Sequence, residues 1–252
     1  MIKIENVVLA SPEQMMFIIE GMRNPLNSHN RMDSSHGYYI RRSALEPCSW
    51  HRIENPTEED LNDEYVEYTD GSFELGKNDL SLMQRLSRAG TDHRKYMRMM
   101  PVYARITAGH TWWAEFDTYK VGTVRNSCSK MHKIHVMGFE QDNFDHEGID
   151  EVGGQALKTF NKVRETLEWL AKQFNETKEK KYWRAIIELL PMGFHLTANV
   201  EMNYEVLANM YRSRKGHKMF EWRDFCKWIE TLPLSELITG LSKENNNNVT
   251  NN

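Results

Sequence analysis

The sequence predicts a mixed fold of the α/β class and α+β type, in which a sheet is combined with several helices. Two patterns predict it. Apolar and polar residues alternate over residues 102–107, as in a half-buried strand, whereas residues 155–174 and 181–190 place apolar side chains at helical spacing. A chain of 252 residues with 40% hydrophobic residues can also bury one sizeable core. We therefore expect one domain over residues 1–243.

The N-terminal segment predicts a strand followed by a helix. Residues 1–10 contain several isoleucines and valines and fit a first strand. Ser11 can then cap a helix, with Pro12 at the first helical position and Gln14 at the position that completes a capping box. The helix should therefore begin at residue 12.

The following part of the chain has a weaker pattern. Residues 24–74 are polar and irregular, which predicts long loops with a short acidic pair of strands around residues 65–73. Asn78 then suits the cap of a helix with apolar residues at helical spacing, and Gly90 suits its end. This helix should precede the strand at residues 102–107.

The C-terminal third predicts further helices and a tail. Pro191 should end the helix that precedes it. A helical region should begin near Asn199 and end at Gly216, and another should follow with its apolar residues within 220–232. Residues 244–252 are rich in asparagine and cannot bury apolar surface, so we expect a disordered tail.

Composition and charge exclude several classes of protein. No segment approaches the roughly 20 apolar residues of a membrane-spanning helix, and the first residues lack the apolar core of a signal peptide, so a cytoplasmic protein without a membrane partner is expected. The formal net charge of -4 argues against a general nucleic-acid-binding protein. The cysteines Cys48, Cys128 and Cys226 are widely spaced and indicate reduced thiols, without a disulfide framework or a cysteine-based zinc site.

A polar segment in the middle of the chain is the first candidate site. Residues 115–133 combine cations, hydroxyl groups and Gly122, which permits close backbone approach. A phosphate monoester needs such directed donors as well as positive charge, although an ordinary solvated loop fits the composition equally well. Trp112 and Trp113 come directly before this segment and suit either a platform for a flat ligand or core packing.

A second candidate lies nearer the C-terminus. Asn203 and Arg214 are eleven residues apart, close to three turns of a helix, so both side chains can point in one direction. An arginine on an apolar helix face needs a partner when it is buried. The alternative is a surface arginine that extends its charge into water.

One further segment offers side chains of the kinds that bind metals. These are His132, His135, Asp142, Asp145 and His146. His-x-x-His spacing is typical of zinc ligands, but the carboxylates follow no fixed spacing, and a solvated loop explains the segment as well. We therefore expect no metal.

The order of motifs along the chain resembles that of flavin-dependent thymidylate synthases. The chain contains, in order, Asp92-His93, a strand, a polar loop at 118–130, Leu190-Pro191 and NYEVLANMYRSR at 203–214. The family contains a Glu-His pair, a loop of the pattern RHRxxSxNxxSxR, a Leu-Pro pair and the pattern NxRxLxNFxxLR. The resemblance extends from residue 75 to residue 230 and implies an antiparallel-rich central sheet flanked by helices.

The polar loop departs from the family pattern. Aligned without gaps, Thr118, Tyr119 and Lys120 stand where the family has RHR. A one-residue insertion would match Asn126 and Ser129 to the family's asparagine and serine, whereas the alignment without gaps would not. Both alignments stay open.

The resemblance implies a reaction and its cofactors. In the family a folate supplies a one-carbon unit, FAD relays it, and NADPH reduces the flavin that reduces the pyrimidine adduct, so that dUMP becomes dTMP. For this chain it implies FAD, NADPH, methylenetetrahydrofolate and a homotetramer in which residues 112–132 meet Arg214 of a neighbouring subunit. The alternatives are an enzyme that adds a hydroxymethyl group and a nucleotide- or flavin-binding module without turnover.

The resemblance also implies roles for individual residues. The implied flavin-binding residues are His93, Thr118, Tyr119, Lys120, Asn126, Asn203 and Asn209. The implied substrate-binding residues are Glu115, Ser127, Cys128, Ser129, Lys130 and Arg214, and the implied catalytic residues are Ser129 and Arg214. Glu115 replaces a family glutamine that contacts uracil. Arg214 would polarise the base, because a planar and permanently charged guanidinium suits an enolate-like pyrimidine.

Cys128 has two interpretations. Lys120, Arg125 and Lys130 are close to it in sequence and would favour its thiolate, which could add to C6 of a pyrimidine as in the folate-only thymidylate synthases. The flavin route needs no such nucleophile. We therefore expect an inert thiol.

Overall fold

The computed structural model describes residues 2–42, 51–54 and 66–241, and the chain is divided into two compact units. Unit 1 consists of Met1–Val8, Tyr103–Met202 and Asn209–Thr231, and unit 2 consists of Leu9–Val102, Asn203–Ala208 and Leu232–Asn252. Each unit is therefore built from three separate stretches of the chain. The tail predicted over residues 244–252 lies outside the described residues.

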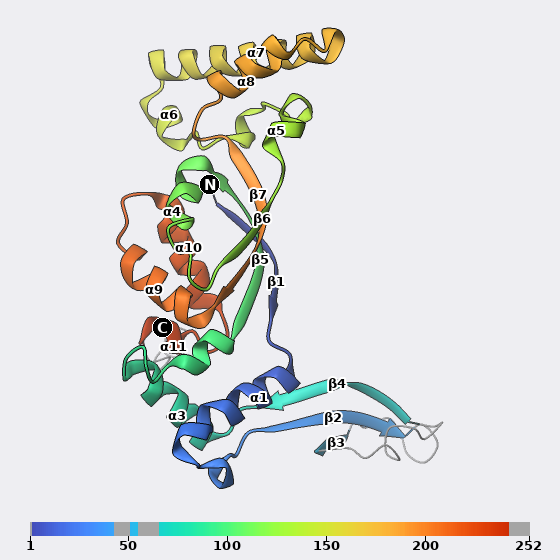
Figure 1. The fold of residues 1–252 in the computed structure, drawn as a ribbon, viewed down its shortest axis with the longest axis vertical. Helices are drawn as coiled ribbons and strands as arrows, with labels where there is room; N and C mark the ends of the chain where they lie inside the picture. Colours follow the sequence, from blue (N-terminus) through green and yellow to red (C-terminus); the bar gives the residue numbers. More distant parts are fainter. Residues whose placement is uncertain (1, 43–50, 55–65, 242–252) are drawn as a thin grey trace, which may run out of the picture. The chain divides into compact units, whose positions relative to one another are not determined.

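A four-stranded sheet forms the centre of unit 1 (Figure 1). In sheet order its strands are β1 (Lys3–Leu9), β5 (Pro101–Gly109), β7 (His195–Asn203) and β6 (Val124–Ser127). β6 and β7 are antiparallel, with Asn126 opposite Asn199. Buried residues alternate with more exposed ones along most of β5, which confirms the strand predicted at residues 102–107. The strand predicted at residues 1–10 is confirmed as β1.

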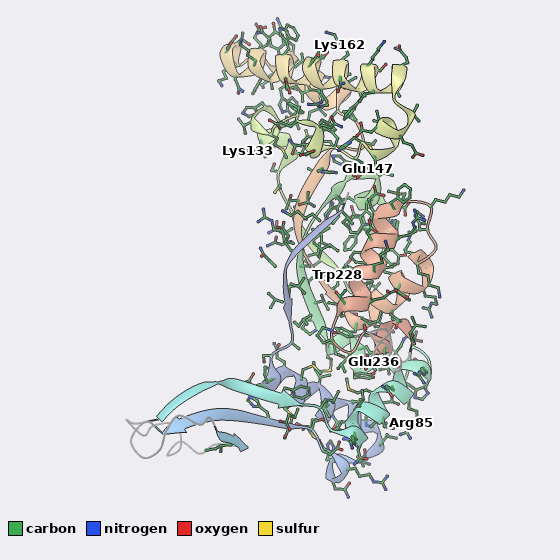
Figure 2. All side chains as sticks on the ribbon, turned by 180° about the vertical axis from the view of Figure 1, so that it is seen from behind. Arg85, Lys133, Glu147, Lys162, Trp228 and Glu236 are labelled. Atoms are coloured by element: carbon green, nitrogen blue, oxygen red, sulfur yellow. The ribbon has the colours of Figure 1, made fainter. Side chains whose placement is uncertain are left out.

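Helices cover one face of this sheet. α4 (His110–Phe116) and α10 (Phe220–Thr231) lie side by side there, and Figure 2 labels Trp228 on α10. The long α7 (Gly154–Thr177) packs against α8 (Lys180–Leu189). Both confirm the predicted amphipathic helices. Within the described residues, no helix is both long enough and apolar enough to cross a membrane.

Short helices complete the connections of unit 1. Between β6 and α7 the chain forms α5 (Lys130–Lys133), the 3-10 turns η4 (Ile134–Val136) and η5 (Gln141–Asn143), and α6 (Glu147–Val152). After β7 the chain forms α9 (Tyr204–Arg214), which begins in unit 2 and ends in unit 1. The polar segment and Arg214 are thus both carried by elements next to the central sheet.

The described part of unit 2 combines helices with a second sheet. Its helices are α1 (Pro12–Arg23), α3 (Lys77–Arg88) and α11 (Glu236–Thr239), with 3-10 turns η1 (Asn24–Leu26), η2 (His29–Arg31) and η3 (Lys95–Met99). Its sheet has the order β3 (His51–Glu54), β2 (Ser35–Arg42) and β4 (Val66–Glu74), and both pairings are antiparallel. The pairing of β2 with β4 contains a register shift between Gly37 and Tyr39.

The long loops predicted for residues 24–74 are wrong where β2, β3 and β4 form. β4 occupies most of the predicted acidic strand pair but is a single strand, and its partner is β2. These strands pair through backbone hydrogen bonds between segments that are distant in the sequence, and such pairing leaves no short-range period in the residues.

The structure confirms one predicted helix cap and corrects two helix starts. The Ser11 side chain accepts a hydrogen bond from the Gln14 amide, and the Gln14 side chain completes the predicted capping box. α3 begins after Gly76, so Asn78 is a helical residue and not the cap. The carboxylate of Asp33 accepts from the first amides of α3 and takes the role expected of Asn78. The helix predicted to begin near Asn199 forms but begins at Tyr204, because Asn199 lies within β7.

Candidate functional site

Arg214, at the end of α9, is the centre of a polar cluster in unit 1. Its Nε donates to the Tyr119 hydroxyl over 2.9 Å, and its Nη1 donates to a Glu115 carboxylate oxygen over 2.5 Å. The same Nη1 lies 3.2 Å from Nε2 of His217. Arg214 is therefore a partnered arginine and not a free surface charge, in agreement with the first interpretation of its place in the sequence.

Two aromatic rings lie against the guanidinium of Arg214. The Cζ atom of Arg214 lies 4.8 Å from the centre of the Trp222 ring and 5.5 Å from the centre of the Tyr119 ring. Nη2 of Arg214 has no hydrogen-bond partner among the described residues, and the side chain is 18% exposed. This group of residues, which we call the Arg214 cluster, consists of Glu115, Tyr119, Arg214, His217 and Trp222. It holds one arginine in a fixed position with one edge left for a ligand.

Trp112 and Trp113 are core residues. They are 0% and 2% exposed, and the indole N–H of Trp113 donates to the backbone oxygen of Leu196 over 3.0 Å. The Trp112 ring lies 4.9 Å from that of Trp113 and 5.0 Å from that of Trp222. Core packing is therefore confirmed for both residues, and the ligand platform is wrong, because neither ring is open to a ligand.

The same aromatic core carries a second cation. The guanidinium of Arg125 on β6 lies 4.8 Å from the centre of the Trp113 ring, and it pairs with Asp117 over 3.1 Å. The Arg214 guanidinium lies over Trp222 in the same core. The tryptophans thus fix the positions of cations from both candidate segments.

Lys130 and His110 form a second polar pair. Nζ of Lys130 lies 3.2 Å from Nε2 of His110, the first residue of α4. Burial lowers the pKa of Lys130. The pKa of His110 is lowered by burial first and then by the charges of Lys130 and Arg125. An anion bound between these residues would relieve this repulsion, so the pair suits a phosphate group.

Replacing His110 with asparagine should weaken the pH dependence of stability. Because the pKa of His110 is lowered in the folded protein, the unfolded chain binds the proton more readily, and the free energy of unfolding falls as the pH decreases through about 6.5. In the variant, the free energy of unfolding should fall less than in the unmodified protein over the same pH range. Urea unfolding at several pH values between 8 and 5 measures the effect. An identical pH dependence in both proteins would contradict the expectation.

The other residues of the polar segment lie on or after β6. Asn126 and Ser127 are exposed and pair with β7, and the amide of Cys128 donates to the backbone oxygen of Thr197 over 3.0 Å. The Ser129 hydroxyl accepts from the amide of His132 and caps α5. In the described part of the chain, no hydrogen bond, ion pair or ring contact joins residues 126–130 to Arg214. The structure thus joins only Glu115 and Tyr119 of the polar segment directly to Arg214.

The residues implied for flavin binding are spread over both units. Thr118 and Lys120 are exposed next to Tyr119, and Asn209 is exposed on α9 with its side-chain oxygen bonded to Arg212. His93, which follows α3, and Asn203 belong to unit 2. Asn203 ends β7 and its side-chain oxygen accepts from the amide of Val206, so the expectation that it shares a helix face with Arg214 is wrong. It is the cap of α9.

Three residues of the site were not predicted from the sequence. His217 follows Arg214 at the i+3 position, which is a weak local signal for a contact. His110 and Trp222 gave no signal, because they meet Lys130 and Arg214 only through the tertiary fold.

The two described cysteines have different surroundings, and alkylation should distinguish them. Cys128 is exposed, whereas burial raises the pKa of Cys226 to about 11, with a further contribution from Glu230. Iodoacetamide should therefore label Cys128 and leave Cys226 unlabelled in the folded protein. Peptide mass spectrometry gives the result, with the urea-unfolded protein as the control in which both thiols react. Equal labelling of both thiols in the folded protein would contradict the expectation that the Cys226 thiol is buried and unreactive.

The metal-ligand residues do not converge. Among the described residues, the group that brings ligand atoms together is Asp145, Glu147 and Glu221, with the atoms within 4.8 Å of one another. Burial acts to raise the pKa of Asp145, but hydrogen bonds outweigh it and lower the pKa, including one over 2.8 Å with His195. His132 is not part of this group. Three acidic side chains alone do not make a metal site, so none is proposed.

Two solved structures show a fold similar to that of this chain. Both are structures of thymidylate synthase X (ThyX) from Helicobacter pylori with FAD and dUMP. The first has a TM-score of 0.57 at 12% sequence identity and covers 94% of this chain and 95% of its own, and the second has a TM-score of 0.56 at 11% identity with 94% and 96% coverage. Neither a protein-family model nor a curated protein matches the sequence. The likeness confirms the predicted fold class, a mixed α/β fold with an antiparallel sheet flanked by helices.

Proposed function

We propose that this chain is a flavin-dependent enzyme that transfers a one-carbon unit to a pyrimidine deoxynucleotide, as thymidylate synthase X does with dUMP. One observation carries the proposal. Arg214, from the C-terminal motif, bonds to Glu115 and Tyr119 at the start of the polar segment, so two motifs that resemble the family meet in one cluster. The similar fold supports the same conclusion.

The Arg214 cluster fits the polar edge of a pyrimidine. Uracil presents the N3–H donor between two carbonyl acceptors. Nη2 of Arg214 is a donor with no partner among the described residues, and the carboxylate of Glu115 is an acceptor. Arg214 can therefore hold a carbonyl oxygen while Glu115 accepts from N3–H. When the ring takes on enolate character so that its C5 can attack the one-carbon unit, the guanidinium would stabilise the negative charge on the carbonyl oxygen without reorganisation, because Tyr119 and Trp222 already hold it in place.

The phosphate of the nucleotide is proposed to bind at the other end of the polar segment. Lys130 supplies the charge, and Ser129 supplies a hydroxyl beside the first amides of α5. Ser127 and Cys128 lie next to these residues at the end of β6. His110, held with a lowered pKa, can take up a proton when the phosphate binds.

Several residues implied for flavin binding have hydrogen-bonding groups without a partner among the described residues. The exposed side chains of Lys120, Asn126 and Asn209 and the amide N–H₂ of Asn203 offer donors of the kind that ring nitrogens, carbonyls and phosphates of FAD accept. The Thr118 hydroxyl donates to the backbone oxygen of Glu115 and can still accept. We propose that Thr118, Tyr119, Lys120, Asn126 and Asn209 of unit 1 hold FAD, whereas the flavin contacts of His93 and Asn203 in unit 2 stay predictions from the family resemblance. When bound, FAD would supply the reducing equivalents that a new methyl group requires. The residues of the chain orient the rings and exclude water.

The remaining components follow from the same proposal. NADPH would supply electrons, methylenetetrahydrofolate would supply the carbon, and the active form would be a cytoplasmic homotetramer. Within one chain Arg214 already contacts Glu115 and Tyr119, whereas the family resemblance implies contact between neighbouring subunits. We therefore propose that the subunit boundary completes the flavin and phosphate sites and not the Arg214 cluster.

Glu115 favours a second candidate substrate. A carboxylate accepts hydrogen bonds only, and it can accept from the exocyclic amino group of cytosine as well as from N3–H of uracil. Cytosine would then offer N3 and its carbonyl oxygen to Arg214. A dCMP-modifying enzyme, with a methyl or hydroxymethyl product, is the second candidate function.

Product analysis tests the proposal. The purified protein is incubated with FAD, NADPH, methylenetetrahydrofolate and either dUMP or dCMP, and the nucleotides are identified by mass spectrometry. A methylated dUMP product would support thymidylate synthesis, and a modified dCMP would support the second candidate. Protein that takes up FAD or nucleotide but forms neither product would be a binding module, and the proposed activity would be wrong.

A further inference from the structure

Unit 2 contains a cavity that none of the residues proposed to bind the nucleotide or FAD lines. It has a volume of about 850 Å³ and lies between α1, the turns η1 and η2, and α3. Three arginines line it, and Arg85 lies on α3 at the surface of the unit (Figure 2). Three asparagines, two serines and two leucines complete the lining, and no carboxylate is among the lining residues. Such a lining repels cations and offers donors to an anion.

Arg23 at the end of α1 lines this cavity and has one donor without a partner among the described residues. The side chain is 3% exposed, and its Nε donates to Asp79 over 2.5 Å. Nη1 donates to the backbone oxygen and the hydroxyl of Ser28, each over 3.3 Å. Nη2 is buried without a hydrogen-bond partner among the described residues. Buried donors of this kind are nearly always satisfied, so this unpaired donor marks an unusual concentration of positive charge behind the wall of the cavity.

The charge of the cavity is positive. The carboxylate of Asp79 is already used by Arg23, by the Ser34 hydroxyl and amide, and by the amide of Asp33. Arg31 and Arg85 are exposed, and neither forms an ion pair within the described part of the chain. The cavity therefore carries the positive charge of these two arginines in addition to the buried Arg23–Asp79 ion pair.

We propose that this cavity binds a small metabolite that carries a phosphate or diphosphate group. Arginine presents a planar set of donors that matches phosphate oxygens, and the exposed Arg31 and Arg85, on two elements, can contact one polyanion with Arg23 behind them. The volume lies within the range of about 300–1,000 Å³ that is typical of small-molecule sites. The proposal is independent of the proposed function, because its residues have no role in the Arg214 cluster or beside Lys130.

Calorimetric titration of the full chain with inorganic pyrophosphate and with ADP tests the site. Arg85→Gln and Arg31→Gln should each weaken binding at least tenfold. Arg88→Gln should leave it unchanged, because Arg88 lies on the same helix, is exposed and does not line the cavity. Lys130→Gln distinguishes this cavity from the phosphate site proposed beside His110.

Three results would overturn the proposal. The first is no binding of either anion at millimolar concentration. The second is equal affinity in the Arg31→Gln and Arg85→Gln variants and the unmodified chain. The third is loss of binding in Lys130→Gln alone, which would place the anion beside His110. A failure of FAD binding or of product formation would leave these titrations valid, so the two proposals can fail separately.

Discussion

Replacing Arg214 with lysine is expected to reduce kcat/KM for the pyrimidine nucleotide at least 100-fold. Lysine keeps the charge but cannot reach Tyr119, Glu115 and the ligand at the same time, because these contacts use different nitrogens of one planar group. It also loses the flat stacking on Trp222. Product formation at several nucleotide concentrations gives kcat/KM, and the absorbance of bound flavin shows whether the variant still holds the cofactor.

Arg212→Lys is the matched control for this variant. Arg212 lies two residues away on α9, is exposed and bonds only to Asn209 within the described residues. Its replacement should change kcat/KM less than threefold. If Arg214→Lys keeps a kcat/KM within tenfold of the unmodified protein, the guanidinium is not part of the site and the assignment of Arg214 is wrong.

Replacing Asp79 with alanine should destabilise the protein by about 3–5 kcal/mol, which is the usual cost of removing one partner of a buried ion pair. Asp79 is 0% exposed and Arg23 is 3% exposed, so the change leaves a buried guanidinium without its counterion. It also removes the acceptor for the amides of Asp33 and Ser34. Urea unfolding gives the free energy of unfolding in each protein.

The exposed pair Asp224 and Lys227 provides the comparison. These residues are three positions apart on α10 and their ends are 3.0 Å apart at the surface, where water screens the charges. Asp224→Ala should therefore change the free energy of unfolding several times less than Asp79→Ala. Similar losses in the two variants would mean that the Arg23–Asp79 pair is not buried as described.

Local patterns predicted the elements that depend on local interactions. The capping box of Ser11 and Gln14 was correct, because both hydrogen bonds form within one turn. The alternation around Val102 was correct, because one face of β5 packs into the core. Such features can be predicted without knowing which other elements pack against the helix or strand.

The failures have a common physical reason. β2 and β4 pair across about thirty residues, and Asn203 was assigned to a helix although long-range pairing places it at the end of β7. Within the site, the contact of Glu115 with Arg214 was not predictable from spacing, because it joins residues 99 positions apart. Family resemblance identified both residues as substrate-binding, but nothing local indicated that they bind each other.

The most direct test of the proposed site is a titration of the FAD-loaded protein with dUMP, followed by the absorbance spectrum of the flavin. If the Arg214 cluster holds the pyrimidine against the flavin, the spectrum should change with a saturable dependence on dUMP, and Arg214→Lys should weaken this dependence at least tenfold. dCMP in place of dUMP shows which base is preferred. A chain that binds FAD but whose flavin spectrum responds to neither nucleotide would contradict the account.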